Sequence, residues 1–254
     1  MPSRGRWQDW DAGDRRHGGD RPALYAGRTA RLSRVEFRLA RGELVRRIAG
    51  KPIDEVAAER IFDPLELAHT GIGLDDDEPD EVATLTAFEA FDRCRNPNAG
   101  LVGDHTQMVP PFNEEGIHRA VIPAANGIGT AADLARFYAC LVNDGALDGT
   151  RILHRTPLMP SRHWRQKPTR TATMSIPSRY GLGVWLTGPK VDRFGSLAPI
   201  GTFGHSGLGS SVGWADPRDD IAFAYVTNGV RELSYEHIAR INTLSDAVRL
   251  ACQY

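Results

Sequence analysis

The chain has 254 residues, of which 41% are hydrophobic and 25% charged, and its formal net charge at pH 7 is −1. These totals are typical of a soluble globular protein with one large domain or two small ones. A charge so close to zero gives no global attraction to nucleic acid or to an anionic membrane. No apolar run reaches the ~18 residues of a membrane span, and the N-terminus lacks the apolar stretch of a signal peptide. A cytoplasmic protein without a membrane span is therefore expected.

Three cysteines, Cys94, Cys140 and Cys252, are far apart in the sequence. Their odd number and wide spacing fit neither a disulfide framework nor a zinc site. We interpret all three as small buried hydrophobic residues, and no metal or organic cofactor is expected.

Residues 1–41 differ in composition from the rest of the chain. They hold ten arginines and five acidic residues, a local charge of +5, whereas the other 21 basic and 27 acidic residues give −6. Because their apolar residues follow neither a helical nor a strand period, we predict a basic, disordered segment. A nucleic-acid-binding arm is the alternative. Residues 42–254 are predicted to form the folded domain.

Regular structure is predicted from Gly42 onward. The stretch "GELVRRIAG" (42–50) places Leu44, Val45 and Ile48 on one face of a helix that ends at Gly50.

A second short helix is predicted in "PIDEVAAERIF" (52–62). Its inward-facing residues are expected to be Ile53, Val56, Ala57 and Ile61. A turn and an extended piece over 63–74 close this unit.

The next stretch, residues 75–120, reads as a long irregular connection with one helix over 81–94. A helix is then predicted after Thr130, an N-cap residue with Asp133 three positions further on, and it ends at Gly145. Its buried stripe is expected to be Leu134, Phe137, Tyr138 and Leu141. Residues 151–178 are basic and proline-rich and are expected at the surface.

The C-terminal part alternates with the period of strands. Strands are predicted in 180–187, 202–207, 210–217 and 221–228, with a tight turn at Asp216–Asp219 and a closing amphipathic helix over 235–252.

Four stretches together resemble the serine β-lactamase and penicillin-binding-protein-like superfamily, in particular its class C-like esterase branch. They are "GELVRRIAGKPIDEVAAERIFDPLEL", "PAANGIGTAADLARF", "YGLGVWL" and "FGHSGLGSSVGWADPRDDIAFAYVTN". Their order and spacing match the C-terminal part of that superfamily over residues 42–252. The resemblance implies an α+β fold: an antiparallel sheet flanked by helices, as a truncated β-lactamase-like domain.

The resemblance also implies acyl-transfer chemistry on a small-molecule ester or acyl substrate. Family members use a Ser-x-x-Lys nucleophile motif, a tyrosine motif and a third motif such as His-Ser-Gly. His205, Ser206 and Gly207 match the third motif, and the N–H of Leu208 would be one oxyanion donor. Asn126 either faces the cleft or satisfies a turn. The His-Ser-Gly variant favours an esterase.

The sequence departs from the family in its missing nucleophile. The residues three positions before the three lysines are Ile48, Trp164 and Thr187, so the only lookalike is Thr187–Lys190, which contains a proline and follows a strand. No Tyr-x-Asn is present either. The chain as written is therefore expected to be inactive, a remnant of a serine hydrolase, with a non-catalytic acyl-binding module or a basic-arm nucleic-acid-binding protein as alternatives.

One hypothesis links the missing motifs to the unusual first 41 residues. With synonymous codons, residues 23–42 read one nucleotide out of frame can spell a Gly-Tyr-His followed by a helix. Residues 1–41 would then be an out-of-frame translation, and the alternative is a divergent tail. A chain without the upstream elements is expected to expose apolar sheet surface and to associate; its oligomeric state is left open.

Overall fold

The computed structural model describes residues 34–74, 82–88, 109–153, 169–171, 174–181, 183–188, 194–207, 211–231 and 235–252. Its helices are α2 (Arg34–Ala49), α3 (Ile53–Ala57), the π-helical turn η2 (Ala58–Phe62), the 3-10 turn η3 (Pro110–Asn113), α5 (Glu115–His118), α6 (Ala131–Val142) and α7 (Tyr235–Ala251). Its strands are β1 (Gly71–Ile72), β2 (Thr86–Phe88), β3 (Gly127–Ile128), β4 (Ala146–Leu147), β5 (Thr150–Arg151), β6 (Thr169–Thr171), β7 (Met174–Tyr180), β8 (Trp185–Leu186), β9 (Phe203–Ser206), β10 (Val212–Asp216), β11 (Ile221–Tyr225) and β12 (Gly229–Arg231).

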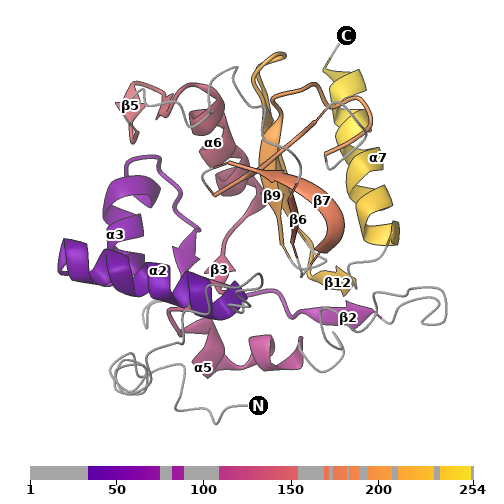
Figure 1. Cartoon of the computed structure of the whole chain (residues 1–254). Helices are drawn as coiled ribbons and strands as arrows, with labels where there is room; N and C mark the ends of the chain where they lie inside the picture. The colour runs from indigo at the N-terminus through magenta and orange to yellow at the C-terminus, as the bar shows by residue number, and fades with distance from the viewer. Residues whose placement is uncertain are drawn as a thin grey trace, which may run out of the picture.

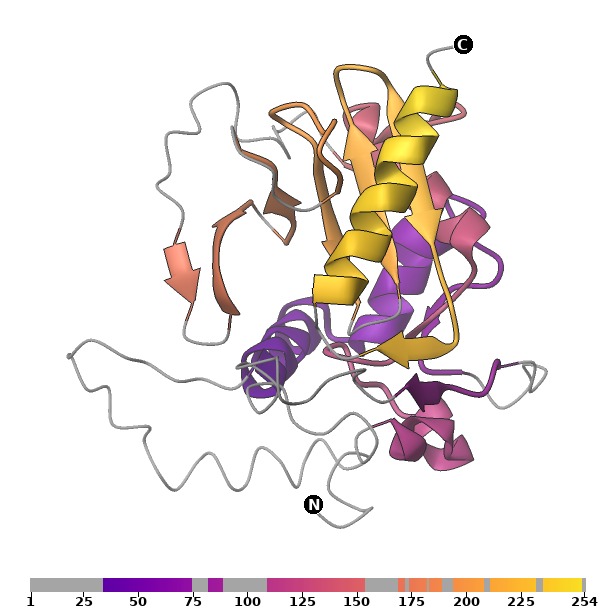
Figure 2. The ribbon, with the colours of Figure 1, turned by 90° about the vertical axis from the view of Figure 1, so that its right-hand side faces the viewer.

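A six-stranded sheet forms the centre of the molecule. Its strands lie in the order β11-β10-β9-β8-β7-β6, and every neighbouring pair is antiparallel. Helix α6 covers one face and α7 the other, as Figures 1 and 2 show from two sides. The α+β architecture, an antiparallel sheet flanked by helices, is confirmed.

Strand β10 is buried along its whole length and supplies side chains to both faces of the sheet. Ala215 joins a cluster with Tyr138 and Leu141 of α6. Val212 and Trp214 point the other way, into a cluster under α7. This alternation is the period of a strand that is covered on both sides.

A buried ion pair fixes α7 to the sheet. Arg249 on α7 donates from Nε to Asp216 at 3.2 Å, and both side chains are almost fully buried. The same guanidinium lies 4.0 Å from the ring centroid of Trp214 and donates to the carbonyl of Phe194 at 2.5 Å. A buried charge is tolerated only when it is paired and hydrogen-bonded, so this cluster determines where α7 sits.

Helix α6 begins where the sequence predicts. Thr130 has extended backbone and its hydroxyl accepts from the N–H of Asp133 at 3.1 Å, the expected N-cap. Gly145 follows the helix with φ of +80°, a conformation that glycine adopts without strain. The strands at 203–206, 212–216 and 221–225, the turn after Asp216 and the helix α7 are also confirmed.

The helical unit at the N-terminal side begins earlier than the sequence pattern indicated. Helix α2 starts at Arg34, eight residues before Gly42, and ends before Gly50 as predicted. Of its expected apolar face, Val45 is half-buried, whereas Leu44 is 56% and Ile48 78% exposed. The described part of the chain thus presents Leu44 and Ile48 of α2 to solvent, and Phe88 in β2 is 46% exposed as well.

Two secondary-structure predictions are wrong. In the described part of the helix predicted over 81–94, residues 82–85 are irregular and 86–88 form the strand β2, which pairs in parallel with β12. The pairing with a strand more than 140 residues away outweighs the local helical pattern, since short propensity signals yield to tertiary contacts. The stretch 180–187 is not one strand but the end of β7, a turn closed by Gly181 N–H to the carbonyl of Val184, and β8.

The segment expected at the surface, 151–178, also contains strands that were not predicted. It contains β6 and most of β7, which extend the sheet. Pro177 lies inside β7, and proline argues against a strand because it cannot donate to the ladder. The β6–β7 register shifts between Thr169 and Thr171, so the pairing accommodates an irregular stretch that the sequence pattern could not reveal.

Two of the cysteines are described. Cys140 is buried as expected, whereas Cys252 is exposed, contrary to the expectation; Cys94 lies outside the described residues. Among the described residues, no helix is long and apolar enough to cross a membrane, and no cluster of His, Cys, Asp and Glu could hold a metal ion.

Candidate active site

The predicted third motif lies at the end of β9, beside the hairpin turn. His205 and Ser206 pair with Gly213 and Val212 of β10, and the N–H of Gly207 donates to the carbonyl of Ser211 at 2.8 Å. On its other side β9 pairs with β8 only through Phe203 and Gly204. The motif therefore occupies the part of an interior strand where the β8 ladder has already ended.

The imidazole of His205 has a defined position. Its ring stacks on the indole of Trp185, with centroids 4.1 Å apart and planes 20° from parallel. Its Nδ1 lies 2.8 Å from the carbonyl oxygen of Ser206. Stacking of this kind orders a side chain, so the half-buried ring is held at the strand end.

Tyr138 of α6 packs near the same strand from the face of the sheet that α6 covers. Burial raises the pKa of its hydroxyl above the ordinary value, and a hydrogen bond with the backbone of His205 acts in the opposite direction. The tyrosine ring also lies where any side chain at Gly213 would have to be. The position of the motif thus depends on the packing of α6 against β9 and β10.

The other two predicted site residues have different outcomes. Leu208, the predicted oxyanion donor, lies outside the described residues. Asn126 is buried, and its side-chain nitrogen donates to the carbonyls of Ile117 at 2.6 Å and Ala120 at 2.7 Å. These bonds place the Asn126 amide within the hydrogen bonding of its own loop.

Ser206 borders a small cavity on the α7 side of the sheet. With Val212, Trp185 and His237 it encloses about 20 Å³, room for about one water molecule. His237 on α7 is 1% exposed. Ser206 therefore borders the α7 side of the sheet.

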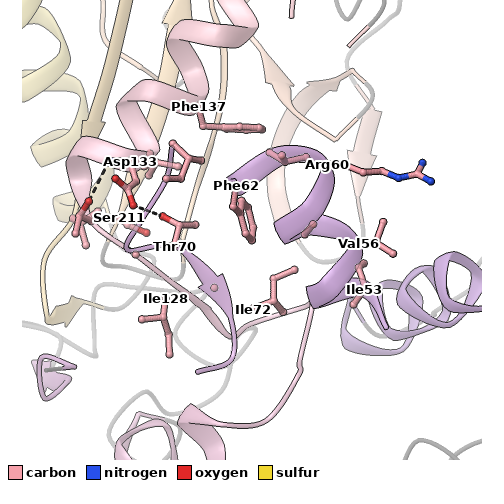
Figure 3. Close-up of a pocket in the computed structure, with 18 of the residues that line it drawn as sticks. Ile53, Val56, Arg60, Phe62, Thr70, Ile72, Ile128, Asp133, Phe137 and Ser211 are labelled. Carbon is pink, nitrogen blue, oxygen red and sulfur yellow. Dashed lines mark hydrogen bonds between the residues drawn. The ribbon is translucent and has the colours of Figure 1, made fainter. Parts of the chain in front are cut away.

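A much larger cavity, of about 590 Å³, lies between the helical unit and α6. Figure 3 shows Ile53, Val56 and Phe62 of the helical unit on one side and Phe137 of α6 on the other. Ser211, whose carbonyl accepts from Gly207, belongs to its wall. The cavity therefore reaches the base of the hairpin that carries the third motif.

The polar groups of this cavity are hydrogen-bonded to one another. Asp133 Oδ2 accepts from the hydroxyl of Thr70 and from the N–H of His69, both at 2.9 Å. Thr130 is occupied by its capping bond to the N–H of Asp133. The guanidinium of Arg60 extends away from the other labelled side chains (Figure 3). What remains for an occupant is an apolar wall.

The cavity is open to solvent on one side, since its lining residue Val226 is 42% exposed. Its volume of about 590 Å³ lies within the range of small-molecule sites in proteins, about 300–1,000 Å³.

The described residues contain no lysine placed as the family's catalytic base. Lys51, the one lysine among them, is exposed and forms an ion pair with Glu59. The hydrogen bond that Lys51 donates to Glu59 raises the pKa of Lys51 above its ordinary value. A lysine that acts as a general base needs a lowered pKa instead. The described part of the site therefore contains the third-motif strand without a lysine suited to act as the base.

Two residues near the motif were not predicted as site residues from the sequence. Trp185 lies in the quoted stretch "YGLGVWL", but only the β8–β9 pairing brings its ring onto His205. Tyr138 was predicted to be buried, without a link to the motif. In both cases the sequence shows only an aromatic residue in a buried pattern. Such residues are far more often part of the hydrophobic core than of a functional site.

Comparisons with known proteins identify the family. The β-lactamase family model matches residues 21–247, and the chain belongs to the β-lactamase family, within the serine β-lactamase and penicillin-binding-protein-like superfamily. It is 32% identical, over 203 residues, to the esterase/beta-lactamase LipL of Mycobacterium tuberculosis, covering 73% of this chain and 45% of the relative.

Solved structures agree with this assignment. A penicillin-binding protein homologue from Caulobacter crescentus superposes with a TM-score of 0.74 at 26% identity, covering 97% of this chain and 66% of that one. A family VIII carboxylesterase shares the fold, with a TM-score of 0.64 at 24% identity over 84% of this chain and 56% of that one. The chain spans about half the length of the curated relatives it matches, 45% and 49%.

Proposed function

We propose that this chain carries the third-motif half of a serine hydrolase site for carboxylic esters or β-lactam-type acyl compounds, and that it does not turn over substrate by itself. One observation carries the proposal. The chain belongs to a hydrolase family and holds His205 and Ser206 in a defined position on β9, yet its sequence contains no Ser-x-x-Lys. Without nucleophile and base, acyl transfer loses most of its rate.

The substrate class rests on the relative whose name states an activity. LipL is an esterase/β-lactamase and shares 32% identity with this chain. The His-Ser-Gly form of the third motif favours the ester over the β-lactam. Small-molecule acyl compounds are therefore the substrates to be tested first.

The direct test is hydrolysis of 4-nitrophenyl butyrate and nitrocefin by the purified chain. The Ser206→Ala variant is the matched control, because Ser206 is the motif residue with a hydroxyl. We expect the same background rate from both proteins. Turnover by the unsubstituted chain that is lost in Ser206→Ala would show an unrecognised nucleophile and overturn the proposal.

We further propose that residues 1–41 include an out-of-frame translation. The family match includes residues 21–41 as they are written, so only the DNA can test this proposal, read across codons 20–45 and several hundred nucleotides upstream, in all frames. We expect another frame to encode a Gly-Tyr-His motif joined to an upstream Ser-x-x-Lys. If no frame contains either motif, residues 1–41 are a divergent tail, and the family match reflects common ancestry without a hydrolase function.

A further inference from the structure

The indole of Trp185 is a rigid support for the ring of His205. Trp185 is 4% exposed and packs in the cluster that contains Trp214 and Ile241 under α7. The β8–β9 ladder ends where Trp185 pairs with Gly204, which has no side chain, and at this strand end the indole stacks on the imidazole. Because the support is itself part of a close-packed core, the imidazole that rests on it has little freedom to rotate.

The backbone of His205 is fixed as well. It pairs with Gly213 of β10 and is hydrogen-bonded to the side chain of Tyr138 on α6. The residue is therefore held at its backbone and at one face of its ring. These two restraints together determine which edge of the ring faces the carbonyl of Ser206.

That edge carries Nδ1, which lies 2.8 Å from the carbonyl oxygen of Ser206. A carbonyl oxygen can only accept, so this contact is a hydrogen bond only when Nδ1 carries a proton. With the proton on Nε2 alone, two lone pairs would face each other at this distance. The contact therefore selects the neutral form of His205 that has its proton on Nδ1 and its lone pair on Nε2.

We propose that Trp185 is the positioning residue of the third motif: its stacked indole keeps His205 Nδ1 on the carbonyl of Ser206, so that Nε2 is the atom through which the motif accepts a hydrogen bond or exchanges a proton. A nitrogen with a lone pair accepts from a hydroxyl or an N–H group and can act as a general base. The inference rests on the proposed function, because proton exchange at Nε2 has a role only at a hydrolase site.

The test reads the protonation of each ring nitrogen of His205 in the full chain with isotope-labelled histidine. Two-bond proton–nitrogen correlation spectra are recorded at about pH 8, where an ordinary imidazole is neutral, and His205→Gln identifies the signals. We expect a protonated nitrogen at Nδ1 and a lone-pair nitrogen at Nε2. Averaged shifts at the two nitrogens, a proton on Nε2 alone, or protons on both would overturn the proposal.

Three variants separate the stack from general stability. Trp185→Leu removes the aromatic face and should give averaged shifts, whereas Trp185→Phe keeps a ring face and should retain the shifts of the unsubstituted chain. The matched control is Ile241→Ala, because Ile241 packs in the same cluster but lies on α7. This variant should lower the urea midpoint and leave the shifts of His205 unchanged.

The contrary outcomes are equally specific. Unchanged shifts in Trp185→Leu would show that the stack does not hold the ring, and averaged shifts in Ile241→Ala would show that the protonation follows overall stability. Either result overturns the proposal. If Trp185→Leu does not fold, averaged shifts in Trp185→Phe overturn it and retained shifts support it.

The proposed function and this inference can fail separately. The spectra need no substrate, so hydrolysis of an ester by the chain would contradict the proposed function and leave the protonation of His205 as measured. Averaged shifts in the unsubstituted chain would overturn the inference and leave the proposed function standing.

Discussion

Gly204 lies where β9 and β10 approach most closely. A side chain there would overlap the carbonyl oxygen of Gly213 and come within 2.7 Å of the Cα of Trp214. Both are backbone atoms of the paired strand, so no rotamer change can relieve the contact. The residue immediately before His205 must therefore be glycine for the motif to keep its place.

Gly204→Ala should consequently destabilise the protein by about 1–3 kcal/mol, the range for overpacked sites. The matched control is Gly127→Ala, because nothing lies within 4 Å of a Cβ at Gly127. Urea unfolding monitored by tryptophan fluorescence compares the two. Equal midpoints for the two variants would show that the β9–β10 spacing is not fixed.

Asp246 on α7 holds the loop that contains Ser196 and Leu197. Its carboxylate accepts from the N–H and hydroxyl of Ser196 and from the N–H of Leu197, at 2.6–2.9 Å. Burial alone would raise the pKa of Asp246, but these hydrogen bonds and the charge of Arg249 outweigh it and lower the pKa below its ordinary 3.8. The folded state therefore favours the charged form.

The stabilisation from Asp246 is complete above the unfolded-chain pKa of 3.8 and is lost as the pH falls through the lower folded value. Asp246→Asn should cost about 1 kcal/mol at pH 7, and the difference from the unsubstituted chain should shrink below pH 3.8. Urea midpoints at pH 7 and pH 3 check this. Asp219→Asn is the control for the size of the effect at pH 7, because that exposed carboxylate pairs with its neighbour Arg218 at the surface, where an ion pair contributes little. A constant difference for Asp246→Asn at both pH values would contradict the prediction.

At the scale of elements, α6 connects the cavity with the motif. Its N-cap Thr130 and the residue Asp133 form the polar end of the cavity, and Tyr138, further along, supports β9. Thr130→Ala should therefore destabilise the protein by about 1 kcal/mol. Thr130→Ser keeps the capping oxygen and should lose little. Thermal midpoints measure both, and an alanine variant as stable as the serine variant would contradict the capping role.

Elements can be predicted from the sequence when their own residues carry a capping or alternation pattern. The capping residues before α6 and the alternating pattern of β9, β10 and β11 are local, and these elements form as predicted. Strand β2 exists only because β12 pairs with it, and β7 forms around Pro177, so neither could be read locally. The motif at His205 was found through resemblance, whereas Trp185 reaches it only through strand pairing.

The large cavity is a second feature that could not be predicted from the sequence. The pattern of α3–η2 predicts an apolar face at Ile53, Val56 and Ile61, and the structure places these residues on the cavity wall. A hydrophobic period indicates which face is covered but not what covers it. That this face borders an open cavity, with Phe137 of α6 on its other side, follows only from the tertiary fold.

At the scale of the whole molecule, the two sides of the fold differ in how fully their apolar residues are covered. The sheet is covered by α6 on one face and α7 on the other, and its β10 is fully buried. The helical unit borders a large cavity and exposes Leu44 and Ile48. Local stability follows the density of buried contacts, so the two sides should open independently.

Hydrogen exchange should show this difference in the isolated chain. Amides of β9, β10 and α7 should be protected longest, and those of α2 and α3 should exchange at least tenfold faster. Mass spectrometry of peptic fragments provides the measurement. Protection of α2 equal to that of β10 would contradict the predicted difference in local stability.

The central claim is that this chain holds one part of a serine hydrolase site and forms no acyl-enzyme by itself. The measurement that tests it most directly is the intact mass of the purified chain after incubation with a fluorophosphonate probe, with LipL as the positive control. The account predicts an unmodified mass for this chain and one added probe for LipL. Stoichiometric addition of the probe to a serine of this chain would contradict it.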